Sequence, residues 1–194
     1  MKLEESFYQR DNVTKIAQEL LGKCIFTRTR GKVTAGIIVE TEAYSHREQG
    51  CHAYRRKTKR NQVMFEAGGV AYVYLCYGIH HLFNIVTNSK DVADAVLIRA
   101  LEPKLGEKQM LRRMNTSSLQ GITSGPGKVA KAMGIDRRHN GVPLWDNEIW
   151  LEDGIPISRS KISASERIGI AYAGKDAFLP WRFTITGNSW VSKP

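Results

Sequence analysis

Apolar and polar positions in the first part of the chain predict one helix followed by two strands. Apolar side chains recur at helical spacing over residues 13–21, with Asn12 placed to cap the start of this helix and Gly22 just past its end. Branched and apolar residues then favour extended structure over residues 23–29 and 35–44. The chain therefore begins with a helix that leads into strands.

A polar stretch over residues 45–69 interrupts this pattern. It holds five cations in the six residues 55–60, and it predicts a long surface loop, a feature that is usually functional or disordered. Beyond it, the pattern predicts strands at residues 70–77, 82–87 and 95–101, helices at about 104–114 and 128–133, and short strands at about 148–152, 167–172 and 181–187. Strands outnumber helices without regular alternation, so we predict a single α+β domain over residues 1–194, with a curved, mainly antiparallel sheet flanked by short helices.

Length and composition indicate a soluble globular protein. With 194 residues, of which 42% are hydrophobic, the chain can bury a substantial core. The longest apolar run, residues 70–79, is about half a membrane span, and no signal-peptide pattern opens the chain. Three cysteines at no disulfide-like spacing suit a reducing compartment. We therefore expect a cytoplasmic protein without a membrane anchor.

The charge balance narrows the class of partner. Twenty-nine basic residues against 19 acidic ones give a net charge of +10 and a pI near 9.7. Such an excess favours a polyanionic partner, with nucleic acid first and an anionic membrane second. No Lys-rich amphipathic helix favours the membrane.

Two acids stand inside the apolar segment over residues 36–44. On a strand, Glu40, Glu42 and Tyr44 share one face, with successive Cα atoms about 6.6 to 7 Å apart. A buried carboxylate has a raised pKa and can act as a general base near neutral pH. The alternative is an edge strand that leaves both acids in water. The segment alone is compatible with both readings.

Tyrosines crowd the next strand and the turn after it. Tyr72 and Tyr74 share a face of the predicted strand, and Tyr77 reaches the turn before Gly78, where its ring can project. Aromatic rings beside a basic surface suggest stacking with nucleic-acid bases. The alternative is ordinary sheet core, because aromatic residues are common in strands.

A glycine-rich segment, Ser124 to Lys128, precedes the predicted helix at 128–133. Exposed N–H groups at a helix start, beside glycines and a lysine, are suited to hold an anion such as phosphate. The spacing is not that of a Walker A motif, and an ordinary capping loop explains the segment equally well.

Metal-ligating residue types are also present, at His46, Cys51, His52, Cys76, His80 and His81. No pair of them has zinc-finger spacing, and nothing marks any cysteine as an activated nucleophile. We therefore predict no metal site and no cysteine catalysis.

Taken together, these segments resemble the alkyladenine (3-methyladenine) DNA glycosylases, which excise alkylated and deaminated purines. The matching stretches are residues 38–44, His52 with 60–65, 69–78, 83–85, 96–103, 124–128, 167–169, 182–183 and 187–192. They occur in the family's order, and the likeness runs from about Leu20 to Ser192. One departure is the pair His80 and His81 just beyond Tyr77, where the family varies.

The resemblance implies roles at the reacting bond. Glu42 would be the general base that deprotonates the attacking water. Arg99 and the backbone carbonyl of Ile168 would help to hold that water. Because the nucleophile would be water and no lysine is placed to attack the sugar, we expect a monofunctional glycosylase without lyase activity.

The resemblance also implies how the damaged purine is bound. Tyr44, His52 and Tyr74 would sandwich the flipped base, and Asn84 would crowd the exocyclic amine of normal guanine. Tyr77 would wedge into the minor groove and fill the gap that the flipped nucleotide leaves. Electron-rich tyrosine faces attract an alkylated purine, which carries positive charge.

The expected partner is double-stranded DNA that contains a damaged purine, of the 3-methyladenine, hypoxanthine or etheno-adenine class. Basic and loop residues would hold its phosphates, namely Arg55, Arg56, Lys57, Lys59, Arg60, Ser124 and Lys128. No cofactor is implied. We expect a monomer with no obligate protein partner, associated with the nucleoid, and the short ends of the chain fit a bacterial-type core enzyme.

Two other functions remain open from the sequence. The chain could be a non-catalytic nucleic-acid-binding module of the same fold, which the presence of both Glu42 and Arg99 argues against. It could also be a glycoside hydrolase that uses Glu40 and Glu42 as a carboxylate pair, since their spacing suits such enzymes. The net charge of +10 argues against that alternative.

Overall fold

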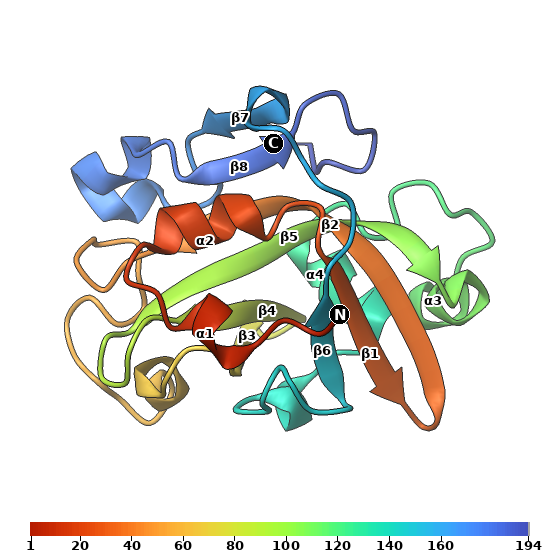
Figure 1. Cartoon of the computed structure of the whole chain (residues 1–194), viewed down its shortest axis with the longest axis horizontal. Coiled ribbons are helices and arrows are strands. Elements are labelled where there is room, and N and C mark those ends of the chain that lie inside the picture. Colours follow the sequence, from red (N-terminus) through yellow and green to blue (C-terminus); the bar gives the residue numbers. More distant parts are fainter. Residues whose placement is uncertain (194) are drawn as a thin grey trace.

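One curled antiparallel sheet forms the centre of the structure, a computed structural model that describes residues 1–193 (Figure 1). Its strands are β1 (Cys24–Thr29), β2 (Lys32–Tyr44), β3 (Ala71–Cys76), β4 (His80–Thr87), β5 (Asp94–Leu105), β6 (Ile149–Glu152), β7 (Ile162–Ser165) and β8 (Arg182–Ile185). They follow the order β3-β4-β5-β2-β1-β6, while β8 pairs with both β2 and β7. The predicted α+β class with a curved antiparallel sheet is confirmed.

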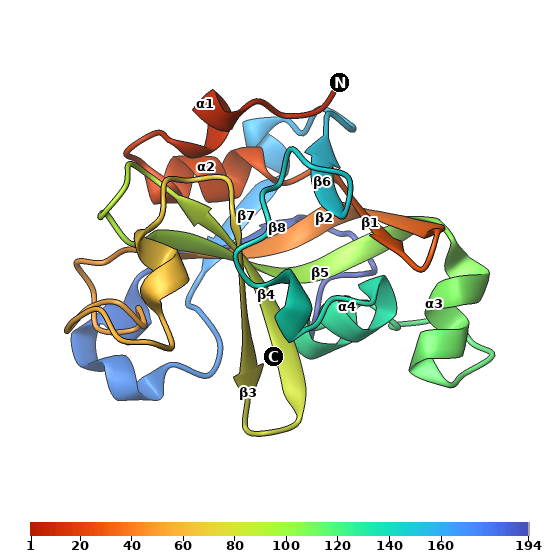
Figure 2. The same cartoon turned by 90° about the horizontal axis from the view of Figure 1, so that it is seen from below.

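Short helices cover both faces of the sheet. The α-helices are α1 (Glu5–Tyr8), α2 (Val13–Glu19), α3 (Glu107–Met114) and α4 (Pro126–Met133), and the 3-10 helices are η1 (Gln62–Phe65), η2 (Arg137–His139), η3 (Arg159–Lys161) and η4 (Ala171–Phe178). Figure 2 shows α1 and α2 on one side of the sheet and α3 and α4 on the other. The main core lies between these layers. Within residues 1–193, no helix has the length and apolar character that a bilayer span requires.

The longest strand, β2, carries the two acids and lies inside the sheet. It pairs with β1, β5 and β8, so it has no free edge at residues 40–42. Glu40 and Glu42 are both completely buried, and the alternative of an edge strand with both acids in water is therefore wrong.

Register shifts between β2 and β5 place an arginine opposite these acids. Glu40 faces Ala100 and Thr41 faces Ile98, so Arg99 has no partner residue on β2. Such a bulge re-aims a side chain, and here it directs Arg99 to the side of β2 that carries the carboxylates.

Most predicted elements occur within a few residues of their predicted bounds. Asn12 caps α2 as expected, because its side chain accepts a hydrogen bond from the Lys15 amide at 2.9 Å. The predicted strand over residues 167–172 is wrong, since these residues are bends and the start of η4. The C-terminal ladder uses β7 instead, which sequence reasoning missed. Strand β7 is largely exposed and lacks the apolar alternation that marks a strand.

The polar segment over residues 45–69 is more than a surface loop. It contributes Cys51, Ala53 and Met64 to a second, smaller core cluster on the sheet. The buried Asn61 side chain ties the segment together, donating to the carbonyls of His52 and Arg56 at 2.8 and 3.0 Å. The prediction of a surface loop failed here because single buried residues lie between short runs of polar residues and form no apolar pattern.

Candidate active site

Arg99 joins the two buried acids of β2. Its Nε donates to Glu40 Oε1 at 2.8 Å, and its Nη1 lies 3.3 Å from Glu42 Oε1. Attraction to Glu42 and Glu40 outweighs the effect of burial and raises the pKa of Arg99. Burying three charges is costly unless they are paired, so this cluster is a feature that the fold has to support with further hydrogen bonds.

Glu40 receives those further bonds. Its Oε1 accepts from Arg182 Nε at 2.7 Å and from the Ser192 hydroxyl at 2.9 Å, and its Oε2 accepts from the Ser192 amide at 2.7 Å. Burial alone would raise its pKa, but the bonds from Arg182 and Ser192 and the charge of Arg99 lower it below 4.5. With four donors on two oxygens, Glu40 is a structural anchor for Arg99.

Glu42 has a different environment. Its Oε1 accepts the Ile168 amide at 2.8 Å, and its Oε2 accepts the Tyr44 hydroxyl at 2.8 Å. Burial and the neighbouring Glu42 raise the pKa of Tyr44, so its phenol stays protonated and remains a donor. Tyr44, Ile168 and Arg99 all line one large cavity, and the carboxylate of Glu42 lies directly behind them.

That cavity has a volume of about 760 Å³ and is walled by aromatic rings. The His52 and Tyr74 rings lie 4.6 Å apart at 67°, and Tyr72 and Tyr74 lie 5.4 Å apart. The His52 ring also contacts the Tyr72 hydroxyl through Nδ1 at 3.0 Å. Burial of this ring and repulsion from Arg60 lower the pKa of His52 to about 4, so it is neutral at pH 7.

Asn84 completes this wall from β4. Its side chain is buried, and its Nδ2 donates to the Tyr72 carbonyl at 3.1 Å, which fixes the orientation of the amide. Asn84 lies on the cavity lining, as the resemblance led us to expect.

Tyr77 lies at the tip of the hairpin between β3 and β4, which projects away from the sheet in Figure 2. The residue is 88% exposed and has a φ of +49°, a left-handed conformation that is rare for a tyrosine. Ile79, two residues further on, is also exposed. An aromatic ring presented in this way contributes nothing to the core, and its left-handed backbone makes the hairpin tip a candidate contact surface.

The glycine-rich segment before α4 lies against the same cavity. The Gly125 amide donates to the Arg99 carbonyl at 3.0 Å, and the Ser124 hydroxyl donates to the Trp190 carbonyl at 2.8 Å. Pro126 begins the helix, and the exposed Lys128 follows it. The segment is thus held beside Arg99 at the cavity rim.

Comparison with known proteins identifies the family. A family model described as Methylpurine-DNA glycosylase (MPG) matches residues 6–189, which is nearly the whole chain. The chain belongs to the methylpurine-DNA glycosylase family. The resemblance seen in the sequence is confirmed, and with it the assignment to the DNA glycosylases of DNA repair.

Individual relatives of this glycosylase are similar to it over 90% or more of their length. A protein of Chlamydia felis is 45% identical over 191 residues, which cover 94% of this chain and 95% of its own. A protein of Carboxydothermus hydrogenoformans is 44% identical over 194 residues, covering 100% of both chains. A protein of Chlorobium luteolum is 46% identical over 181 residues, covering 92% of this chain and 90% of its own. All three bear the name "Putative 3-methyladenine DNA glycosylase".

The cations of the basic cluster over residues 55–60 do not all lie at the cavity. Arg60 lines the cavity, and its guanidinium lies 5.5 Å from the centre of the Tyr74 ring. Lys57 lies over the Phe65 ring. The remaining members of the cluster are exposed and lie outside the cavity lining, namely Arg55, Arg56 and Lys59.

Sequence reasoning missed a buried ion pair beneath the site. Arg167 donates to both carboxylate oxygens of Glu48, at 2.6 and 2.9 Å, and to the Ala43 carbonyl at 2.9 Å. Its guanidinium also lies 4.7 Å from the centre of the Tyr44 ring. The pair supports Ile168 and Tyr44, which both donate hydrogen bonds to Glu42. No local pattern marks it, because its members are 119 residues apart.

Among residues 1–193, no three His, Cys, Asp or Glu side chains lie close enough together to hold a metal ion. The three cysteines are free, and burial raises the pKa of Cys24 to about 11 and that of Cys51 to about 12.

Proposed function

We propose that this glycosylase flips alkylated or deaminated purines out of duplex DNA and hydrolyses their N-glycosidic bond with water that Glu42 activates. The product is an abasic site in an unbroken strand. The observation that carries this proposal is the position of Glu42. The buried carboxylate lies directly behind the wall of an aromatic cavity, beside Arg99.

Glu42 is suited to be the general base because three donors already orient its carboxylate. A water that enters between the cavity wall and the sugar meets this carboxylate, and Arg99 offers it a further donor. The resemblance assigned the Ile168 carbonyl to the same water. The contact in the structure is made by the Ile168 amide, which supports an additional role for this residue in positioning Glu42.

The aromatic wall suits a cationic base. Tyr44 and Tyr74 present electron-rich faces, and a neutral His52 adds no charge that would repel an alkylated purine. Asn84 is fixed by its bond to the Tyr72 carbonyl, so it cannot turn aside from the exocyclic amine of guanine. These features support selection of damaged purines over normal guanine, in the 3-methyladenine, hypoxanthine and etheno-adenine class.

Tyr77 is proposed as the wedge that replaces the flipped base in the stack. Its exposure at a hairpin tip beside the cavity supports this role. The cations over residues 55–60, together with Ser124 and Lys128, are proposed to hold phosphates of the duplex, which would make DNA binding fall with salt. We propose that the enzyme works as a monomer on nucleoid DNA.

We propose a water nucleophile and no lyase step. A lyase needs an amine to attack the sugar carbon. Among the described residues, Lys128 is the one lysine on the cavity lining, and we assign it to phosphate. Reduction with borohydride should therefore trap no covalent complex between enzyme and DNA.

The test is single-turnover release of free base from duplexes that each carry one 3-methyladenine, hypoxanthine or etheno-adenine. We expect release from at least one lesion, with a strand that stays intact until alkali is added. The matched controls are Glu42→Gln, which should release nothing, and Glu66→Gln, which removes the same charge at an exposed position outside both cavities. Lesion binding by the wild type without release from any duplex would instead support the non-catalytic binding module.

A further inference from the structure

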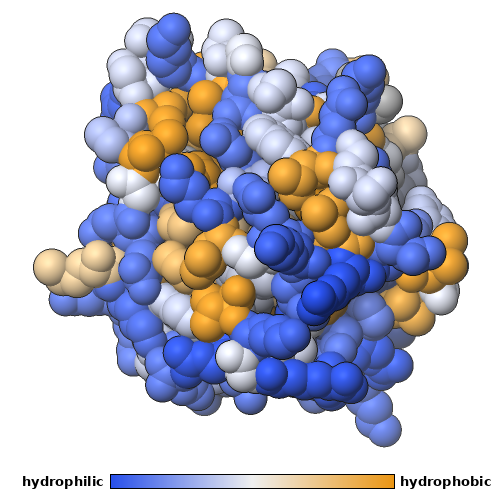
Figure 3. Space-filling view, turned by 90° about the vertical axis from the view of Figure 1, so that its right-hand side faces the viewer, coloured by the Kyte–Doolittle hydropathy of each residue, from blue (hydrophilic) through white to orange (hydrophobic). Residues whose placement is uncertain are grey.

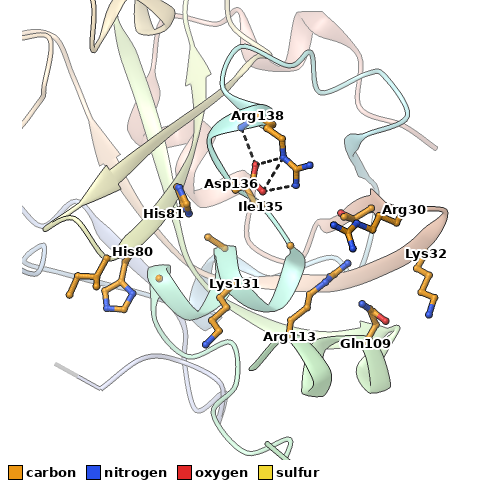
Figure 4. Close-up of a pocket in the computed structure, with 15 residues that line it drawn as sticks. Arg30, Lys32, His80, His81, Gln109, Arg113, Lys131, Ile135, Asp136 and Arg138 are labelled. Atoms are coloured by element: carbon orange, nitrogen blue, oxygen red, sulfur yellow. Dashed lines mark hydrogen bonds and ion pairs between the residues drawn. The ribbon is translucent and has the colours of Figure 1, made fainter. Parts of the chain in front are cut away.

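A second hollow lies beside the hairpin that carries Tyr77. It has a volume of about 630 Å³ and is enclosed by α3, α4, the turn between β1 and β2, and the start of β4 (Figure 4). His80 and Gly127 line both this hollow and the catalytic cavity. From Gly127 it follows α4 to Gly134 at the end of that helix. The two hollows are therefore neighbours, and they are otherwise built from different residues.

The second hollow is strongly basic. Its lining holds five cations against one carboxylate, the cations being Arg30, Lys32, Arg113, Lys131 and Arg138. The carboxylate, Asp136, is already paired with Arg138 at 2.7 Å, as the dashed lines in Figure 4 show. No ion pair satisfies the other four cations within residues 1–193, and Figure 3 shows that hydrophilic residues cover much of this side of the molecule.

Arg113 places one of these charges in the lining of the hollow, where the residue is half-buried. Its Nη1 donates to the Thr34 hydroxyl at 3.1 Å and to the Ala132 carbonyl at 2.8 Å, and its guanidinium packs against Gly134. Its Nη2 is buried and has no partner in the described residues. Closing the end of α4 explains the Nη1 contacts. It does not explain why three further cations, all exposed, gather above an arginine that has no counter-ion.

Like charges that gather without counter-ions repel one another, and a bound anion would relieve that repulsion. The cations extend from the β1–β2 turn to α4, which suits an extended polyanion better than one small ion. The hollow also adjoins the cavity that would receive the flipped nucleotide.

We propose that this hollow is a second phosphate-binding site, which holds the sugar-phosphate backbone of the same duplex away from the damaged nucleotide. The proposal rests on the proposed function, because the polyanion is taken to be the DNA on which Glu42 acts. Backbone contacts of this kind carry no sequence information, and they fix the register of the protein on DNA. The site would hold the duplex in place while the nucleotide is flipped.

The test compares two triple variants that each remove three positive charges. The first carries Arg30→Gln, Lys32→Gln and Lys131→Gln in the hollow. The control carries Lys15→Gln, Arg159→Gln and Lys161→Gln, which are also exposed and line neither hollow. Affinity for an undamaged duplex is measured across a range of salt concentrations. Thermal unfolding of both variants verifies that they fold.

We expect the hollow variant to lose about 10- to 100-fold in affinity near physiological salt. The slope of log affinity against log salt should fall by about 2 to 3, since each phosphate contact contributes about 0.9. The control variant should stay within about 3-fold of the wild type in affinity. A single Lys131→Gln variant should lower the slope by about 1.

Equal losses in both triple variants would overturn the proposal, because they would show only a general field effect. Unchanged binding by the hollow variant would overturn it as well. Base release by the wild type is measured on the same preparation. If the wild type releases no base, the proposed function fails, whereas release together with equal binding by the two triple variants removes only the role of the hollow.

Discussion

Glu40→Gln should destabilise the protein much more than Glu42→Gln, although the two acids lie on the same buried strand. Glu40 accepts four hydrogen bonds and faces the guanidinium groups of Arg99 and Arg182. A glutamine at this position leaves Arg182 without a counter-ion and leaves Arg99 with Glu42 as its remaining carboxylate partner. It also turns an NH₂ group toward one of the present donors.

The magnitude follows from the loss of one partner in a buried charge pair, which costs about 3–5 kcal/mol. For 194 residues, an unfolding entropy of about 2.1 cal/mol/K per residue converts this loss into a melting temperature about 7–12 °C lower. Glu42→Gln keeps one oxygen acceptor, and Glu40 still balances the charge of Arg99. Its cost should therefore be nearer one charged hydrogen bond, about 1–3 kcal/mol.

Calorimetry or urea unfolding of the two variants and the wild type measures this difference. Because the pKa of Glu40 is lowered, its stabilisation is present above about pH 4.5 and is lost as the pH falls through its folded pKa. The difference in unfolding free energy between the wild type and Glu40→Gln should therefore become smaller below pH 4.5. If the unfolding free energy of Glu40→Gln at pH 7 lies within about 1 kcal/mol of the wild-type value, Glu40 is not the structural anchor for Arg99.

Three further predictions concern the cavity and its support. Tyr77→Ala should leave the melting temperature unchanged and lower the ratio of affinity for lesion DNA to affinity for undamaged DNA by about 5- to 150-fold, since stacking contributes about 1–3 kcal/mol; an unchanged ratio excludes the wedge. By NMR titration the pKa of His52 should lie well below 6.5, because burial and the charge of Arg60 lower it, and Arg60→Gln should raise it; a value above 6.5 contradicts this. Glu48→Gln should lower the unfolding free energy by about 3–5 kcal/mol and slow base release, because it breaks the bidentate pair with Arg167. A wild-type unfolding free energy together with a wild-type rate of release would show that the pair is dispensable.

The features that the sequence predicted correctly depend on residues that lie close together along the chain. Alternation along a strand placed Glu40, Glu42 and Tyr44 on one side of β2, and the turn at Gly78 placed Tyr77 where its ring projects. The resemblance supplied the rest of the cavity lining. Tyr44, His52, Tyr74 and Asn84 do come together there.

Features that depend on pairing between distant segments could not be predicted. The bulge that aims Arg99 exists only in the register of β5 against β2. The Glu48–Arg167 pair and the second hollow likewise join segments with no shared local signal. The strand expected at 167–172 failed for a related reason, since the Ile168 amide bonds to Glu42 and is not used in a ladder.

The most direct test of the central claim is base release by wild type and Glu42→Gln from the same lesion-bearing duplex, with binding to that duplex measured in parallel. We expect the wild type to release the damaged purine and to leave an intact strand that breaks only under alkali. Glu42→Gln should still prefer lesion DNA and release nothing, because its cavity is kept while the base is lost. Release by Glu42→Gln at the wild-type rate would contradict the assignment of Glu42 as the residue that activates water.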